Sequence, residues 1–208
     1  MKKILLFTLL LLTIGFVRKT KAQEIIPTAG YMLAGSAEFY EGKIDFDNAP
    51  TFGVSMMYTK DRTSPGIELS YSHTSTTGHF KPYPGFNLDE KKFDVNINYL
   101  HIGVVKGAQV NQMLYPFLSL SAGGTWLNAH DYSTIWRFST ALGGGAKIYF
   151  TKRIGIMLRA RLLVPMQFAG AGGWCGIGTG GPDCGLSVNS YSTIVQGDFT
   201  GGLIIKLR

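Results

Sequence analysis

The chain has 208 residues, enough for one domain with an interior of its own. Only 16% of the residues are charged, against about 25% in ordinary soluble domains, and after residue 22 no stretch approaches the roughly 18 apolar residues of a membrane helix. Five of the 20 basic side chains and none of the 13 acidic ones precede residue 23, so the remaining chain is nearly neutral. These totals exclude a helical membrane protein and argue against nucleic acid as a partner.

The first residues have the organisation of a secretory signal peptide. Lys2 and Lys3 precede an apolar run at 4–17, and the segment ends on the small residue Ala22. We therefore predict a signal peptide at residues 1–22 and one exported domain at 23–208. Three basic residues close to the cleavage site leave an uncleaved anchor as the alternative: Arg18, Lys19 and Lys21.

Alternation of apolar and polar residues along the exported domain predicts β-strands. In the clearest stretch, 154–164, every second residue is apolar and the other parity carries Arg159 and Arg161. A helix would place these arginines far apart around its axis, whereas a strand places both on one face. The same pattern predicts eight strands, at residues 31–40, 52–59, 67–72, 93–99, 118–126, 136–150, 154–164 and 195–207.

The connections between these strands are of two kinds. Turn formers predict tight turns at 60–66 and 151–153, and 106–112 is a third connection on the same side. Polar or Gly-rich segments predict longer loops on the other side, at 41–50, 74–90, 128–134 and 169–190. After Tyr99 the alternation changes phase, which indicates a bulge or an early end of that strand. Pro165 is expected to loosen pairing because it has no N–H to donate.

Strands of this length, joined alternately by short and long connections, are typical of outer-membrane barrels. The predicted fold class is all-β, an eight-stranded antiparallel up-and-down transmembrane β-barrel. The apolar parity of each strand is expected to face lipid, as at Val54, Leu142 and Leu158. For the strand at 93–99 this assigns four residues to the lipid face: Phe93, Val95, Ile97 and Tyr99.

A soluble lipocalin-like barrel with the two faces exchanged is the alternative. Two observations favour lipid. The polar parity is rich in Gly, Ser, Thr and Asn and poor in Lys and Glu, unlike a surface in contact with water. Aromatic residues gather near strand ends, as at Tyr58 and Trp136, where a bilayer meets water.

The interior of an eight-stranded barrel is only wide enough for side chains. Charged residues on the inward parity must therefore pair with one another, because a single buried ion would be very costly. We expect this network to fill and hold the barrel, with a narrow gated pore as the alternative. The predicted charge network comprises Glu38, Glu68, Arg137, Lys147, Arg159, Arg161, Asp198 and Lys206.

Several segments resemble the final hairpins of bacterial outer-membrane β-barrel proteins of the OmpA/OmpX-like class. They are Trp136-Arg137-Phe138, Gly143-Gly144-Gly145, Lys147-Ile148-Tyr149-Phe150, Arg153-Ile154-Gly155 and Arg159-Ala160-Arg161. The resemblance implies a small eight-stranded barrel in the outer membrane of a Gram-negative bacterium, and it implies no activity. Such proteins usually finish on an aromatic residue, whereas this sequence finishes Lys206-Leu207-Arg208.

Two motifs carry possible chemistry. Cys175 and Cys184 are the only cysteines and lie in one loop of an exported protein, so we predict a disulfide between them. His73 and Ser75 share one parity of a strand near its outer end. Side chains two residues apart on one face can come close enough for a hydrogen bond between a nucleophile and its base. His-x-Ser is common by chance, however, so no catalysis is expected, and neither a cofactor nor a metal.

Three functions follow as hypotheses. The first is a structural or binding scaffold that presents extracellular loops and whose partner is the outer-membrane lipid. The second is an accessory subunit of a larger outer-membrane complex, bound through lipid-facing or loop aromatics such as Phe80, Tyr83, Phe86 and Trp174. The third is a lipid-modifying enzyme built around His73 and Ser75.

Overall fold

The computed structural model describes residues 23–33, 35–38, 41–60, 64–86, 88–129, 134–178, 181–192 and 195–207, so the predicted signal peptide lies outside it. The strands are β1 (Gln23–Leu33), β2 (Ser36–Glu38), β3 (Gly42–Phe46), β4 (Ala49–Thr59), β5 (Gly66–Pro82), β6 (Lys91–Gly107), β7 (Leu114–Ala129), β8 (Ile135–Tyr149), β9 (Ile154–Gly178), β10 (Gly181–Ser192) and β11 (Gln196–Lys206). Within this part of the chain no helix is long and apolar enough to cross a membrane.

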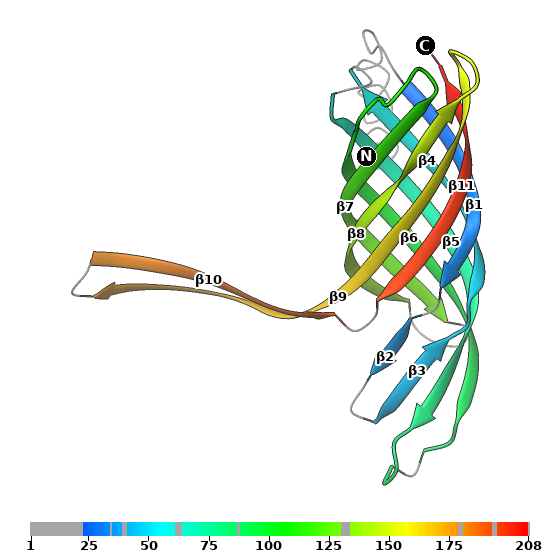
Figure 1. Cartoon of the computed structure of the whole chain (residues 1–208). Helices are drawn as coiled ribbons and strands as arrows, with labels where there is room; N and C mark the ends of the chain where they lie inside the picture. The colour runs from blue at the N-terminus through cyan, green and yellow to red at the C-terminus, as the bar shows by residue number, and fades with distance from the viewer. Residues whose placement is uncertain are drawn as a thin grey trace, which may run out of the picture.

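Eight of these strands close into a barrel (Figure 1). Each pairs antiparallel with its neighbours in the order β1, β4, β5, β6, β7, β8, β9 and β11, and β11 returns to β1. Closure leaves the wall with no unpaired edge, which is the condition for a β-structure to cross hydrocarbon. The predicted fold class is confirmed.

The two ends of the barrel differ. Tight connections join β4 to β5, β6 to β7 and β8 to β9 at the end where β11 also finishes. In the connection after β6, the Asn111 Oδ1 accepts from the backbone N–H groups of Met113 and Leu114, at 2.9 and 2.7 Å. At the opposite end, β5 and β6 continue beyond the wall with β2 and β3 beside them, and β9 and β10 form a second long hairpin (Figure 1).

The first barrel strand is not the one that the sequence predicts. Residues 31–40 were expected to form it, whereas β1 covers Gln23–Leu33 and β2 lies outside the barrel, paired with β3. β1 must match the full height of β4 and β11, and its register runs from Glu24 opposite Lys206 to Leu33 opposite Gly197. Pro27 has no N–H to donate, yet β1 tolerates it. It lies opposite Val54 of β4, and the pairing with β11 skips from Ile25 to Thr28.

Two segments predicted as loops are strands. Residues 41–50 contain β3, and most of 74–90 extends β5 to Pro82, paired with β6 as far as Phe80 opposite Lys91. The polarity of 74–82 reflects contact with water, while its threonines favour extended backbone. The prediction of a loop at the Gly-rich segment 169–190 is likewise wrong, because this segment forms much of the β9–β10 hairpin.

Pro165 does not end regular pairing, because β9 continues past it and pairs with β8 at Ser139. On its other side β9 changes partner at this point. It pairs with β11 as far as Leu163, opposite Gln196, and with β10 from Met166, opposite Ser192. The missing N–H therefore falls where the ladder is already interrupted.

The lipid-facing assignment is wrong for the strand at 93–99. Val95, Ile97 and Tyr99 point inward and are at most 3% exposed. Leu100, Ile102 and Val104 form the outer face of β6 instead, at 45, 61 and 52% exposure. There is no bulge, because the register between β5 and β6 is continuous. The apolar parity changes because β6 packs its apolar side chains inside the barrel in the half nearer the long hairpins and turns its polar ones outward there.

On the other walls the predicted outward residues are exposed. They include Phe52 of β4, Leu69 of β5, Leu120 of β7, Leu142 of β8 and Leu158 of β9, each 44–63% exposed. Together they form an apolar band around the barrel, whereas most of the charged and hydroxyl-bearing side chains of these strands point inward. This arrangement is the reverse of a water-soluble barrel.

Candidate functional site

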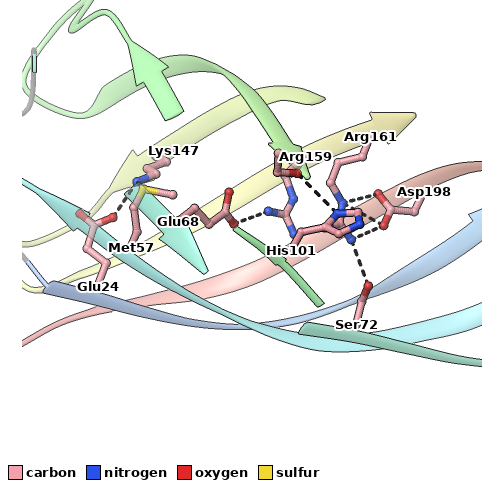
Figure 2. A network of polar contacts seen from close by, with 10 residues as sticks. Glu24, Met57, Glu68, Ser72, His101, Lys147, Arg159, Arg161 and Asp198 are labelled. Atoms are coloured by element: carbon pink, nitrogen blue, oxygen red, sulfur yellow. Dashed lines mark hydrogen bonds and ion pairs between the residues drawn. The ribbon is translucent and has the colours of Figure 1, made fainter. Parts of the chain in front are cut away.

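A belt of charges crosses the middle of the barrel interior (Figure 2). The Nη1 of Arg159 on β9 donates to Oε1 of Glu68 on β5 at 2.6 Å. Two residues along, the Nε of Arg161 donates to both carboxylate oxygens of Asp198 on β11 at 3.1 Å, and its Nη2 also donates to that carboxylate and to Ser72. All four charged side chains are buried. The belt therefore ties together three strands of the wall.

A second buried ion pair lies nearer the end with tight turns. The Nζ of Lys147 on β8 donates to Oε2 of Glu24 on β1 at 2.6 Å, and it lies 2.7 Å from the Met57 sulfur. The Tyr149 hydroxyl donates to the other oxygen of Glu24 at 2.7 Å. Figure 2 shows this pair at one side of the belt.

Glycine on β8 makes room for the arginines of β9. Gly143 lies directly opposite Arg161 in the register. A Cβ at Gly143 would lie 2.9 Å from Cγ of Arg161 and 2.7 Å from Oγ of Ser119, closer than side chains approach. The Gly143-Gly144-Gly145 motif thus has a steric role that spacing alone does not reveal.

Apolar layers close the barrel on both sides of the belt. Along β9 the inward residues are Met157, Arg159, Arg161 and Leu163 in order, so the charges lie between two apolar positions. Met157 belongs to a buried cluster with Ile26, Met57, Val105, Tyr115, Phe117, Tyr149 and Ile204. Leu163 belongs to another, with Met32, Phe46, Val95, Ile97, Tyr99 and Ala141. Side chains fill the interior at all three levels, an arrangement that disfavours a pore.

The eight residues of the predicted charge network lie in different parts of the structure. Five of the eight are buried in ion pairs: Glu68, Lys147, Arg159, Arg161 and Asp198. Arg137 and Lys206 are half-buried near the ends of β8 and β11, and among the described residues neither has an ion pair. The Glu38 side chain lies outside the described atoms, and its strand β2 is not part of the wall.

Sequence reasoning missed several interior polar residues. Glu24 was assigned to the segment before the first strand, although it has the inward parity of Met32. The alternation that includes Tyr31 and Leu33, followed back toward residue 23, was the signal that could have found it. His101, whose Nε2 lies 2.6 Å from the Ser139 Oγ, was hidden by the change of phase after Tyr99.

The outer wall carries an aromatic row at the edge of the apolar band that is nearer the long hairpins. The rings of Tyr71 and Trp126 stack at 6.2 Å between centroids, and those of Trp126 and Trp136 at 5.0 Å. These rings come from β5, β7 and β8, and they lie toward the end with the long hairpins. Aromatic rings of this kind mark the boundary between lipid and water.

His73 and Ser75 lie just beyond this row on the outward face of β5. The Ser75 Oγ is 3.4 Å from the His73 Nε2, and the His73 Nδ1 is 2.8 Å from Oδ1 of Asn98 on β6. The sequence placed the histidine and serine on one face but gave no sign of Asn98, which lies 25 residues further along. Among the described residues, no group of three or more His, Cys, Asp or Glu could hold a metal ion.

Comparison of the structure with solved structures shows the fold. Neisserial surface protein A matches with a TM-score of 0.57 at 11% identity, over 88% of this chain and 96% of that chain. Ail, the attachment invasion locus protein of Yersinia pestis, matches with a TM-score of 0.50 at 13% identity, over 90% and 99%. The outer membrane protease OmpT of Escherichia coli matches with 0.52 at 9% identity, over 91% and 98%.

The chain therefore has the fold of small outer-membrane β-barrel proteins, as the sequence predicts. No protein-family model matches the sequence, and no curated protein matches it. The likeness to the solved structures concerns the fold alone.

Proposed function

We propose that the protein is an integral outer-membrane barrel that acts as a scaffold and presents two hairpin platforms to the cell exterior. The observation that carries this proposal is the combination of an apolar outer band with an interior filled by ion pairs. A wall of this kind is stable in lipid and its filled interior disfavours a pore, so the extended hairpins are the surfaces available for recognition. The tight turns face the periplasm, as is usual in such barrels.

The first platform, formed by β2, β3 and the outer ends of β5 and β6, is cross-linked by side chains. Asp45 pairs with Lys43 at 3.0 Å and Lys81 at 3.5 Å, and the hydrogen bond from Lys43 lowers the pKa of that carboxyl. His79 lies 3.0 Å from Asp47. The contacts of Lys81 and His79 link β3 and its neighbouring loop to β5.

Labelling on intact cells tests the orientation. We expect Lys81→Cys, on the first platform, to react with a membrane-impermeant maleimide, whereas Lys152→Cys, in the tight turn after β8, reacts only after the outer membrane is opened. Both variants change an exposed lysine, so each is the control for the other. Equal labelling of the two on intact cells, or recovery of the protein in the soluble fraction, would contradict the proposal.

The second platform, the β9–β10 hairpin, is the site of the proposed disulfide. Cys175 and Cys184 are directly opposite each other in the antiparallel register. Neighbouring Cα atoms in such pairs are about 4.5–5.5 Å apart, within the range that a disulfide spans. We expect the native protein to be about 2 Da lighter than its reduced form by intact-mass spectrometry. Alkylation of both thiols without prior reduction would show that the bridge is absent.

A second candidate function is membership of a larger outer-membrane complex. The observation in its favour is exposed apolar surface at the tip of the first platform, where Tyr83 is 39% and Leu88 46% exposed to water. The side chain of Trp174, also predicted to dock, lies outside the described atoms. Purification in mild detergent distinguishes the two roles, because a subunit retains a stoichiometric partner and a lone scaffold does not.

A further inference from the structure

The outer wall holds a chain of hydrogen-bonding side chains at the level where a bilayer meets water. His73 and Ser75 follow Tyr71 on the outward face of β5, and the register sets them opposite Asn98 and Asn96 of β6. On the side toward the tight turns the wall is apolar, with Leu69 and Leu100 exposed. Two residues along a strand span about 6–7 Å, so the histidine lies about one headgroup layer from the aromatic row. The site therefore lies in the interfacial region, within reach of lipid headgroups and of the ester bonds beneath them.

The histidine is held in the orientation of a general base. Oδ1 of Asn98 accepts from the Tyr71 hydroxyl at 2.9 Å and from the Nδ1 of His73 at 2.8 Å. An amide oxygen only accepts, so the ring proton resides on Nδ1, and Nε2 presents its lone pair to Ser75. Asn98 is 5% exposed although it belongs to the outer face. Its burial beneath Tyr71 and His73 fixes the ring.

Ser75 has both a base and a donor group beside it. Its Oγ is 3.4 Å from the His73 Nε2, a separation that is common before substrate binds and that tightens in the reacting complex. Its hydroxyl donates to Oδ1 of Asn96 at 2.5 Å. Rotation of that amide brings its NH2 group to the same place, which frees the hydroxyl for His73 and provides a donor for a negatively charged oxygen.

We propose that Ser75, His73 and Asn98 form a serine hydrolase site that cleaves the fatty-acyl ester of an outer-leaflet lipid. Ser75 Oγ attacks the ester carbonyl carbon while its proton passes to His73 Nε2, and Asn96 donates to the carbonyl oxygen as it becomes negative. The bond from the carbonyl carbon to the lipid oxygen then breaks, and His73 protonates that oxygen, which leaves an acyl group on Ser75. Water attacks the acyl carbon and gives a proton to His73, a fatty acid leaves, and the proton returns to Ser75.

The position of the site selects the substrate. The three side chains lie on the outside of a wall whose interior is filled, so a substrate reaches them only from the membrane plane or from the water above it. The apolar surface of Leu69 and Leu100 favours a molecule whose acyl chain is already in the bilayer. Phospholipid and lipopolysaccharide both carry such esters, and the structure defines the bond that is common to them.

The test uses the full exported chain, purified in detergent and reconstituted into vesicles. One set contains phosphatidylethanolamine and phosphatidylglycerol, and a second contains lipopolysaccharide as well. Released fatty acids are measured by mass spectrometry, and a fluorophosphonate probe reports an activated serine independently of the lipid. We expect release from at least one set and labelling at Ser75. Release from the first set identifies phospholipid as a source, and release confined to the second identifies lipopolysaccharide.

Matched variants separate catalysis from a structural role. Ser75→Ala and His73→Ala should lower the rate by about 10³-fold or more, whereas Thr77→Val, on the same face of β5, should leave it unchanged. Asn98 is a positioning residue, so Asn98→Leu should lower kcat and the rate of probe labelling while KM changes little. Asn98→Asp should recover most of the kcat and of the labelling rate. Thermal unfolding confirms that each variant is folded. No release from either set together with no label at Ser75, or full activity in folded Ser75→Ala, would overturn the proposal.

Discussion

Replacement of Asp198 by alanine is expected to lower the free energy of unfolding by about 3–5 kcal/mol. The substitution leaves the Arg161 guanidinium in a site that is 6% exposed, without the carboxylate that receives its Nε and Nη2 groups. A charge that is buried without a partner costs more than the pair contributes, because its desolvation is no longer offset. Equilibrium unfolding in urea from lipid vesicles measures the difference.

Two controls define this expectation. Asp45→Ala breaks an exposed pair with Lys43 on the first platform and should lower stability far less, because water screens both charges. Combining Asp198→Ala with Arg161→Leu removes both charges and should recover a large part of the loss. If Asp198→Ala proved as mild as Asp45→Ala, the charge belt would contribute little to holding the barrel together.

Leu142→Arg is expected to destabilise the barrel by about 2–4 kcal/mol in a bilayer, because it places a charge on the lipid face near the centre of β8. Leu142 is 58% exposed and lies between Leu120 and Leu162 of the adjacent strands. In contact with water, the same substitution would be almost neutral. The measurement therefore tests which solvent touches the wall.

Leu88→Arg is the matched control for this substitution. Leu88 is 46% exposed and lies between β5 and β6, beyond the barrel wall, so arginine there should change stability by less than about 0.5 kcal/mol. Equally small losses at the two positions would mean that the apolar band of the barrel does not face hydrocarbon.

The predictability of this fold from sequence varies along the chain. Where lipid meets the wall and small polar residues line the interior, as at Val54 on β4 and Leu158 on β9, the period of two identifies both the strand and its outer face. Near the outer edge of the membrane and beyond it this contrast disappears, because polar side chains face outward there and apolar side chains pack inside. Val95 and Ile97 were therefore assigned to the wrong face, and the strand at 74–82 was taken for a loop.

The candidate sites show the same division. Parity placed Arg159 and Arg161 inside and His73 beside Ser75, because both relations lie within one strand. Their partners come from other strands, and only the barrel's register decides them. Asp198 is 37 residues from Arg161, Glu24 is 123 residues from Lys147 and Asn98 is 25 residues from His73.

By itself the sequence determined the class of fold, the number of barrel strands and the lipid-facing side of most of them. These are consequences of local alternation in strands whose outer face is apolar. The tertiary structure alone decided which charges pair, how far the strands extend beyond the membrane and which asparagine orients His73. The physical reason is that a side chain two residues away is placed by the geometry of its own strand, whereas a partner across the sheet is placed by how the whole barrel closes.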